Sequence, residues 1–200
     1  MTTSCIINTA ALGPRAHDIT GSRTPTPHAA RAHVLRSVIL PLAMSMFDDV
    51  IVAGEWEDGA GYRYVPCPST TFSCVDALAQ RQAGFEAATG DVLVFQHDDH
   101  LVLPFAPALL AALRGVLVPT RKTNLRSRNE VLPNGFPSYI SGHCAIYARA
   151  VLDACPWGAV PPVHVWDIAH TAQIHAAGFP VNLSSQLIAL DIEYGATPWQ

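Results

Sequence analysis

Residues 81–99 read Arg81-Gln82-Ala83-Gly84-Phe85-Glu86-Ala87-Ala88-Thr89-Gly90-Asp91-Val92-Leu93-Val94-Phe95-Gln96-His97-Asp98-Asp99. The apolar run from Asp91 to Gln96 is typical of a strand that is buried on both faces of a sheet. The preceding helical pattern, over about residues 75–88, ends at Gly90, a residue that commonly closes helices. We therefore predict a helix and then a central strand, with the carboxylates of Asp98 and Asp99 directly after the strand.

The rest of the chain alternates short apolar runs with helical stretches, which predicts one α/β domain over residues 1–200 with a largely parallel sheet. Further strands are predicted at residues 5–8, 48–54, 62–65, 115–118 and 141–147, and one or two at 181–192. Further helices are predicted at residues 28–42, ending near Pro41, and at 105–113 and 166–177. Residues 13–27 and 120–138 are expected to be loops.

The composition excludes several classes of protein. Half of the residues are hydrophobic and 14% are charged, so a wholly disordered chain is excluded. The net charge of −4 lacks the basic excess that binding to a phosphate backbone requires, which disfavours a nucleic-acid partner. Neither a transmembrane segment nor a secretory signal is recognised, so we expect a cytoplasmic protein. The five cysteines are an odd number without a Cys-x-x-Cys pair, and we expect reduced thiols.

In open α/β sheets, ligands bind beyond the carboxyl ends of the strands, which places Asp98 and Asp99 at the expected binding edge. Two adjacent carboxylates repel each other unless a cation, a hydroxyl group or a proton compensates. Oxygen ligands of this kind suit Mg²⁺ or Mn²⁺, whose remaining ligands are commonly water and substrate phosphates. The alternative is that the two aspartates only end the strand and cap the segment that follows.

The stretch from Arg81 to Asp99 resembles the run "R-N-x-G-x-x-x-A-x-G-D-x-[apolar]4-x-D-x-D" of the family-2-like glycosyltransferases of the GT-A fold. A weaker resemblance covers most of the chain in the family's order, including Gly142–Tyr147, Trp166-Asp167 and Gly178-Phe179-Pro180-Val181. It implies a single GT-A-like domain whose mixed, mainly parallel sheet is flanked by helices. It also implies a nucleotide-diphospho-sugar donor and Mn²⁺ or Mg²⁺ as cofactor.

Carried over position by position, the resemblance implies roles for individual residues. Asp99 is implied as the metal ligand, and Asp191 is the carboxylate nearest to the position of the family's second metal-binding residue, a histidine that has no clear match here. Asp167 is implied as the general base that takes the proton from the acceptor hydroxyl. The resemblance implies that the donor is bound by residues at the ends of three strands and by one residue of the helix at about 75–88. These residues are Thr9, Glu55, Glu57, Asp58, Asp98 and, on the helix, Arg81. Alternatively, the acidic residues after the second strand form a solvated turn, and Asp167 is only a helix cap.

The sequence departs from the family pattern at His97, where many members have an aspartate, and at Trp166, which replaces a glutamate. The processive enzymes' Q-x-x-R-W element is absent, since residues 172–175 read Ala-Gln-Ile-His. We therefore expect non-processive transfer. The nine histidines do not form a recognised zinc motif. Trp157 and Trp166 are either sugar-stacking residues or buried aromatics. The basic residues Arg121, Lys122, Arg126 and Arg128 either fold over the diphosphate or lie on an exposed loop.

These features predict a hexosyltransferase-type glycosyltransferase that moves a sugar from a nucleotide-diphospho-sugar donor to an unidentified acceptor. The resemblance also implies inversion at the sugar. One alternative is a GT-A-like nucleotide- or sugar-binding protein that has lost turnover, because three family positions are altered. A nucleotidyltransferase is a further alternative, although the glycine-rich phosphate loop after the first strand is missing. An oligomer or a partner protein could supply the acceptor site.

Overall fold

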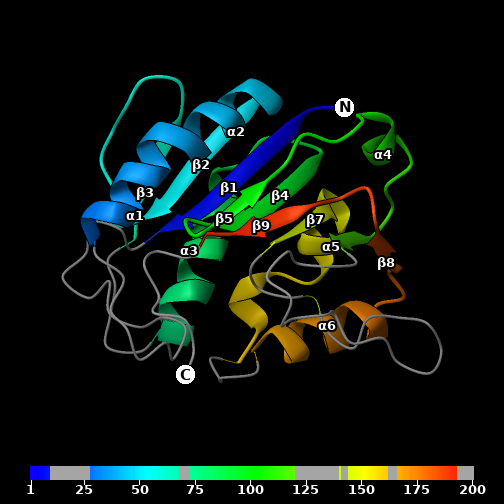
Figure 1. The fold of residues 1–200 in the computed structure, drawn as a ribbon. Helices are drawn as coiled ribbons and strands as arrows, with labels where there is room; N and C mark the ends of the chain where they lie inside the picture. The colour runs from blue at the N-terminus through cyan, green and yellow to red at the C-terminus, as the bar shows by residue number, and fades with distance from the viewer. Residues whose placement is uncertain (10–27, 68–72, 120–139, 141–143, 162–165, 193–200) are drawn as a thin grey trace, which may run out of the picture.

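The computed structural model describes residues 1–9, 28–67, 73–119, 140, 144–161 and 166–192. The strands are β1 (Thr3–Thr9), β2 (Asp49–Gly54), β3 (Arg63–Pro66), β4 (Val92–His97), β5 (His100–Val102), β6 (Val116–Pro119), β7 (Cys144–Ala148), β8 (Val181–Ser184) and β9 (Ala189–Asp191). The helices are α1 (His28–Val34), η1 (Leu35–Ile39), α2 (Leu40–Met46), α3 (Ser73–Ala87), α4 (Ala108–Ala111), α5 (Arg149–Ala154), η2 (Trp157–Ala159) and α6 (Trp166–Ala176). Figure 1 shows their arrangement.

Seven strands form one sheet in the order β3-β2-β1-β4-β7-β6-β8. The pairs of β1 with β2, β1 with β4, β2 with β3 and β6 with β8 are parallel, whereas β7 is antiparallel to both β4 and β6. Strands β5 and β9 form a separate antiparallel ribbon in which His100 lies opposite Asp191. The predicted α/β class with a mixed, mainly parallel sheet is confirmed.

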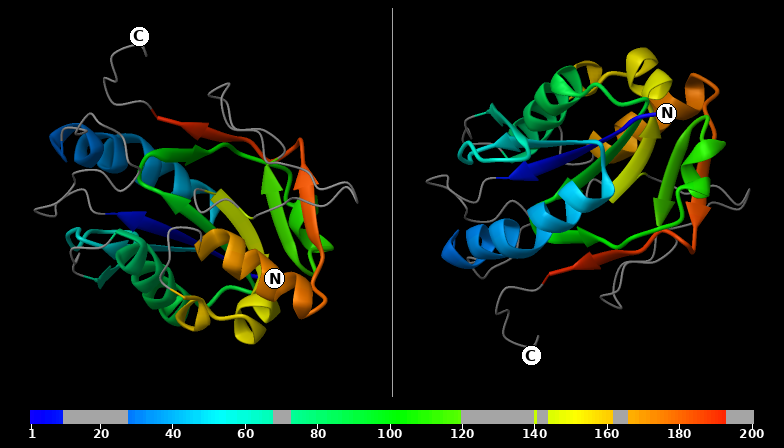
Figure 2. Two further views of the ribbon diagram at one scale, coloured as in Figure 1. Left: turned by 90° about the horizontal axis from the view of Figure 1, so that it is seen from below. Right: turned by 90° about the horizontal axis from the view of Figure 1, so that it is seen from above.

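The side chains of the sheet alternate between two cores, because successive residues of a strand point to opposite faces. In β1, Cys5 and Ile7 pack on the face covered by α1, η1, α2 and the β5–β9 ribbon, and Ile6 packs on the face covered by α3, α5 and α6. Figure 2 shows these two layers on either side of the sheet. Strands β1 and β4 lie at the centre of the sheet, and their carboxyl ends therefore meet between the two layers.

The helical segment that begins at His28 continues to Met46, past the end predicted near Pro41. Proline inside an α-helix normally removes a hydrogen bond and clashes with the carbonyl group four residues earlier. Here the segment before it, η1, is a π-helix, and the N–H of Leu40 bonds to the carbonyl oxygen of Leu35. This wider turn accommodates Pro41 and lets the helix continue.

Other predicted bounds also differ from the structure. The predicted helix at residues 105–113 is only the short α4, and β5, α5 and η2 were not predicted. The predicted strand at residues 141–147 begins at Cys144 as β7, since residues 141–143 lie outside the described part of the chain. The four cysteines whose side chains are described, Cys5, Cys67, Cys144 and Cys155, are free thiols, as expected.

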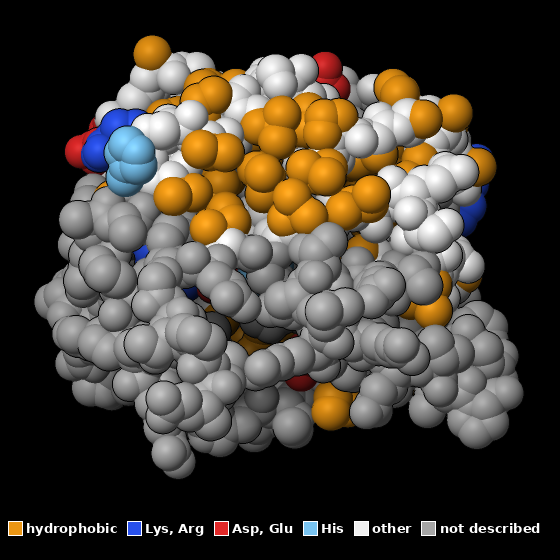
Figure 3. Space-filling view, in the orientation of Figure 1, with side chains coloured by type: hydrophobic (Ala, Val, Ile, Leu, Met, Phe, Trp, Pro, Cys, Tyr) orange, Lys and Arg blue, Asp and Glu red, His pale blue; other side chains and the backbone are white. Residues whose placement is uncertain are grey.

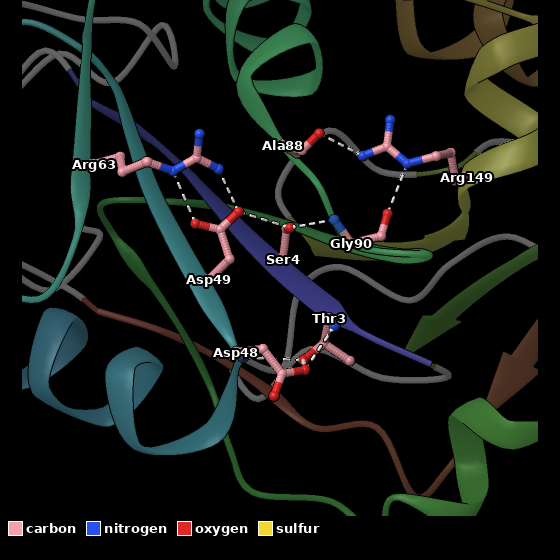
Figure 4. Close-up of polar contacts among 8 residues, drawn as sticks. All are labelled: Thr3, Ser4, Asp48, Asp49, Arg63, Ala88, Gly90 and Arg149. Atoms are coloured by element: carbon pink, nitrogen blue, oxygen red, sulfur yellow. Dashed lines mark hydrogen bonds and ion pairs between the residues drawn. The ribbon is translucent and has the colours of Figure 1, made fainter.

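Polar contacts fix the amino ends of the central strands, at the edge of the sheet opposite to Asp98 (Figure 4). Asp49 accepts hydrogen bonds from Ser4 Oγ at 2.9 Å and from Arg63 Nε at 3.0 Å. The guanidinium of Arg149 donates to the carbonyl oxygens of Ala88 and Gly90, just after α3 ends. These bonds satisfy carbonyl groups of the connection between α3 and β4. The amino edge is therefore closed by internal bonds.

Hydrophobic side chains gather over the upper part of the face seen in Figure 1 (Figure 3). Val38 and Met44 of the α1–α2 segment and Ile188 beside β9 are exposed. None of the helices that the structure describes is long and apolar enough to cross a bilayer.

Candidate functional site

The carboxyl ends of β1 and β4 bring Thr9 and Asp98 together. The two strands are parallel neighbours with Asn8 paired to His97, so the next residue of each strand leaves the sheet at the same edge. The N–H of Asp98 bonds to the carbonyl oxygen of Asn8 at 3.1 Å, and the Thr9 hydroxyl donates to Oδ2 of Asp98 at 2.7 Å. Both side chains are buried, at 2% exposure. The sheet itself therefore holds this part of the site.

Arg31 of α1 contacts both aspartates. Its Nη2 donates to Oδ2 of Asp99 at 2.8 Å, and its Nη1 lies 3.5 Å from Oδ1 of Asp98. The Arg31 side chain is 8% exposed. Sequence reasoning missed this residue, although a signal was present. Arg31 precedes Leu35 and Ile39 by four and eight residues, which places it on the buried face of the helix, where a charged side chain requires a partner.

Two histidines complete the surroundings of Asp99. Nδ1 of His100 is hydrogen-bonded to Oδ1 of Asp99, and the ring of His100 lies 6.2 Å from that of His97. His97 therefore lies near Asp99 and His100. Asp98 and Asp99 each direct one carboxylate oxygen to Arg31 and the other to a second protein group, Thr9 or His100.

The environments of the two aspartates push their pKa values in opposite directions. Burial raises the pKa of Asp98 to about 6, with the neighbouring Asp99 charge adding to the rise and Arg31 opposing it. Burial also raises the pKa of Asp99, but the hydrogen bond from His100 and the charges of His100, His97 and Arg31 outweigh it and hold the pKa well below its usual value. Asp99 is thus the permanently charged member of the pair, as a metal ligand must be.

The three acidic residues predicted after the second strand differ in their positions. The N–H of Glu55 bonds to the carbonyl oxygen of Thr9 at 3.0 Å, and the Glu55 side chain is half-buried, so this residue belongs to the site edge. Glu57 forms an ion pair with Arg36 on the helical segment, and both it and Asp58 are exposed. The solvated-turn interpretation describes the surroundings of Glu57 and Asp58 better than those of Glu55.

Arg81 lies in a box of aromatic rings on the α3 side of the sheet. Its guanidinium is 5.0 Å from the ring centroid of Trp157 and 5.2 Å from those of Phe95 and Trp166. Its side chain is fully buried, and burial lowers its pKa to about 10. The predicted donor-binding role of Arg81 stays a prediction, and the structure adds a packing role. Trp157 and Trp166 are themselves buried, as the second interpretation of these residues expected.

Asp167 is the second residue of α6 and is half-buried. Its Oδ1 accepts the N–H of Ile168 at 2.9 Å, a contact that stabilises the first turn of a helix. Its charge also acts on Arg81, where it partly offsets the effect of burial on the guanidinium pKa. Asp167 therefore lies near the Arg81 box, and its role as the base stays a prediction.

Asp191 lies opposite His100 in the β5–β9 ribbon, and the N–H of Ile192 bonds to the carbonyl oxygen of Asp99 at 2.8 Å. The backbone of Asp191 is thus close to the acidic pair, while its side chain lies outside the described part of the structure. The basic residues Arg121, Lys122, Arg126 and Arg128 also lie outside it.

The carboxylate oxygens of the site are suitable ligands for a hard divalent cation such as Mg²⁺ or Mn²⁺. Such ions commonly take one or two carboxylates and complete their shell with water and phosphate oxygens. Oδ1 of Asp98 and Oδ2 of Asp99 contact Arg31, so an ion bound to these oxygens would take the place of the guanidinium. Among the described residues, no group of three or more His, Cys, Asp or Glu side chains forms a complete metal site.

A zinc site built from the helix histidines does not fit the geometry of α6. His170 is buried, its Nε2 lies 2.9 Å from the carbonyl oxygen of Cys155, and its ring stacks on Trp157 with centroids 3.6 Å apart. His175, by contrast, is exposed on the same helix. These contacts give His170 a packing role.

Asn8 carries a buried polar group that points to a ligand at this edge. Its side chain is 2% exposed, and neither its amide oxygen nor its amide nitrogen has a hydrogen-bond partner in the structure. Buried polar atoms are nearly always bonded to protein, water or ligand. Sequence reasoning did not single out Asn8, which precedes Thr9 at the end of β1.

The fold is similar to those of solved glycosyltransferases. With S. aureus TarS the chain shares 14% identity at a TM-score of 0.65, over 96% of this chain and 37% of that one. For the mannosyltransferase PcManGT from Pyrobaculum calidifontis, solved with GDP-Man and Mn²⁺, the identity is 16% and the TM-score 0.59, over 95% and 56%. Glucosyl-3-phosphoglycerate synthase from Mycobacterium tuberculosis, solved with Mn²⁺, UDP and phosphoglyceric acid, gives 15% and 0.55, over 98% and 72%.

No protein-family model and no curated protein matches the sequence. At these identities the likeness shows the fold, and it confirms the predicted GT-A-like architecture. The chain spans less than two thirds of the length of TarS and of PcManGT.

Proposed function

We propose that this chain, which has the GT-A-like fold of nucleotide-diphospho-sugar transferases, itself transfers a sugar from such a donor to an acceptor. The observation that carries the proposal is the buried Asp98–Asp99 pair at the shared carboxyl edge of β1 and β4. In a sheet of this kind, ligands bind at that edge. The unpartnered carboxamide of Asn8 at the same edge supports a ligand there.

The residues of the site divide the work of the reaction. Asp99 and Asp98 would hold Mn²⁺ or Mg²⁺, and Asp191 is proposed as a further ligand. When bound, this ion supplies positive charge that stabilises the diphosphate leaving group. Thr9, Glu55 and Asp98 at the strand ends would contact the donor, and Glu57, Asp58 and Arg81 are proposed as further donor-binding residues.

Asp167 takes the proton of the acceptor hydroxyl as its oxygen bonds to the anomeric carbon of the sugar. The bond between that carbon and the diphosphate oxygen breaks, and its electron pair leaves with the nucleoside diphosphate. A single displacement of this kind inverts the configuration at the anomeric carbon. The absence of the Q-x-x-R-W element supports a non-processive enzyme.

A thermal-shift panel of UDP, GDP, CDP and dTDP, each with and without Mn²⁺, tests the donor site. A ligand that binds only the native state raises its stability in proportion to ln(1 + [L]/Kd). We expect one nucleotide to stabilise the protein in the presence of Mn²⁺, and Asp99→Ala to abolish this effect. Asp153→Ala, on the exposed surface of α5, is the matched control and should behave as wild type. No shift with any nucleotide would overturn the proposal.

A binding protein without turnover is the second candidate, and Arg31 is the observation that favours it. The guanidinium already neutralises the acidic pair that a catalytic metal would otherwise bind. His97 and Trp166 also replace acidic residues of the family pattern. A nucleotide that binds without hydrolysis or transfer of its sugar conjugate would identify this candidate.

A further inference from the structure

Arg31, Asp98 and Asp99 form a buried group of charges at the carboxyl edge of the sheet. Arg31 lies 2.8 Å from Asp99 and 3.5 Å from Asp98. The side chain of Arg31 is 8% exposed, that of Asp98 is 3% exposed and that of Asp99 is 15% exposed. A buried ion pair is compensated only while both partners are present. The guanidinium therefore compensates part of the charge of both carboxylates.

Arg31 contacts the carboxylate oxygens that an added divalent cation would bind. Oδ2 of Asp98 is held by the Thr9 hydroxyl, and Oδ1 of Asp99 is held by His100. Oδ1 of Asp98 and Oδ2 of Asp99 are the atoms that contact Arg31, so an ion that binds these two oxygens takes the place of the guanidinium. Mg²⁺ binds oxygen ligands at about 2.0–2.1 Å, so an ion of this type cannot share the space with a guanidinium group.

We propose that Arg31 is an internal counterion that holds the Asp98–Asp99 pair until a divalent cation displaces it. This inference rests on the proposed function, since it concerns the metal of the same site. The competition weakens the apparent affinity for the metal, because a protein binds a ligand only in the fraction of molecules whose site is open. Arg31 therefore raises the concentration of divalent cation that is needed to occupy the site.

The test measures Mn²⁺ binding without nucleotide, by the loss of the electron paramagnetic resonance signal of free Mn²⁺. We expect Arg31→Gln to bind Mn²⁺ about tenfold more tightly than wild type, or better, because the competing cation is gone. The matched control is Arg63→Gln, which removes an arginine–aspartate pair at the opposite edge of the sheet and should leave Mn²⁺ affinity unchanged. Equal or weaker Mn²⁺ binding by Arg31→Gln overturns the inference, as does a lack of Mn²⁺ binding by both proteins.

A second measurement uses wild-type protein and does not depend on the folding of a variant. Phenylglyoxal modifies accessible arginines, and mass spectrometry gives the modified fraction of Arg31, with Arg63 as the internal reference. Displacement predicts that Mn²⁺ increases the modification of Arg31 and leaves that of Arg63 unchanged. Unchanged or reduced modification of Arg31 contradicts it. Should Arg31→Gln not fold, Arg31→Lys keeps the charge but loses the planar fork, and its Mn²⁺ affinity should still exceed that of wild type.

The nucleotide panel separates this inference from the proposed function. If a nucleotide binds while Mn²⁺ affinity is independent of Arg31, the counterion role is wrong and the donor site stands. If Arg31→Gln tightens Mn²⁺ binding while no nucleotide binds, the counterion role stands and the donor site is wrong.

Discussion

The Thr9 hydroxyl donates a 2.7 Å hydrogen bond to Oδ2 of Asp98, although 89 positions separate the two residues. The parallel register of β1 and β4, which pairs Asn8 with His97, accounts for this contact. Thr9 ends the buried run of β1, and Asp98 follows β4, whose residues are buried except for the partly buried His97. The position of the Asp98 carboxylate is therefore fixed by the centre of the sheet.

Thr9→Val tests the energetic value of this contact. Valine keeps the branched shape of threonine but removes the donor and leaves a buried carboxylate oxygen without its hydrogen bond. We expect a loss of about 1–3 kcal/mol in the free energy of unfolding, measured by urea denaturation at neutral pH. Thr3→Val is the matched control, because Thr3 donates to the exposed Asp48 at 2.9 Å, and its loss of stability should be smaller than that of Thr9→Val. Equal losses in the two variants would contradict the special status of Thr9.

Asp98→Asn tests the raised pKa of the buried carboxyl. Burial raises the pKa of Asp98 from 3.8 to about 6, so between these pH values the folded chain holds a proton that the unfolded chain has released. Rising pH therefore removes stability from wild type across this window. Asparagine has no such proton. The free energy of unfolding of the variant relative to wild type should therefore increase from about pH 4 to about pH 6 and then level off.

The comparison between the two proteins is needed because His170 acts in the opposite direction. Burial lowers the pKa of His170 to about 4, so the folded chain keeps it neutral while the unfolded chain is protonated, and stability rises with pH in the same window. This contribution is common to wild type and Asp98→Asn and cancels in their difference. Urea denaturation at several pH values measures that difference, and a difference independent of pH would show that Asp98 titrates normally.

The central part of the fold was predictable from the sequence because its signals are local. The apolar run at residues 91–96 became β4, and the helical pattern before it became α3. The elements that were missed are short and depend on distant partners. The three-residue β5 is ordered by pairing with β9, about 90 residues later in the chain, and no local pattern encodes that pairing. The antiparallel direction of β7 is likewise set by its neighbours.

The site shows the same division. The meeting of Thr9, Glu55 and Asp98 follows from the rule that parallel strands end at one edge, so it could be predicted. Arg31 could not be assigned to the aspartates without the packing of α1 against the sheet, because residue spacing alone does not say which carboxylate a buried arginine meets.

Close packing between α3 and the sheet explains why a glycine is found at position 84 of the Arg81–Asp99 stretch. A Cβ atom at this residue would lie 2.4 Å from Cγ2 of Ile6 in β1, so the helix could not approach the sheet as closely. Alanine favours a helix by about 1 kcal/mol over glycine, but overpacking a core costs about 1–3 kcal/mol or more. We expect Gly84→Ala to lower the urea midpoint.

Gly158→Ala is the matched control for this substitution. The three atoms nearest to its Cβ would all belong to Gln82, at ordinary contact distances of 3.7–3.8 Å, and stability should change little. A wild-type midpoint for Gly84→Ala would show that α3 shifts without cost and that close packing does not require this glycine.

Asp167→Asn separates the two interpretations of Asp167. If Asp167 only accepts the Ile168 N–H in the first turn of α6, the side-chain oxygen of asparagine can accept the same hydrogen bond, and turnover should not change. As a general base, asparagine cannot take the acceptor proton, and kcat should fall by about 10²–10⁴-fold. We expect the second result, with nucleotide binding and unfolding midpoint close to wild type.

The assay follows release of the nucleoside diphosphate from the sugar donor that the thermal-shift panel selects. Asp153→Asn, exposed on α5, should keep full turnover. Wild-type kcat in Asp167→Asn would leave Asp167 with the helix-start role alone, and the base would then have to be sought among other carboxylates near the Arg81 box.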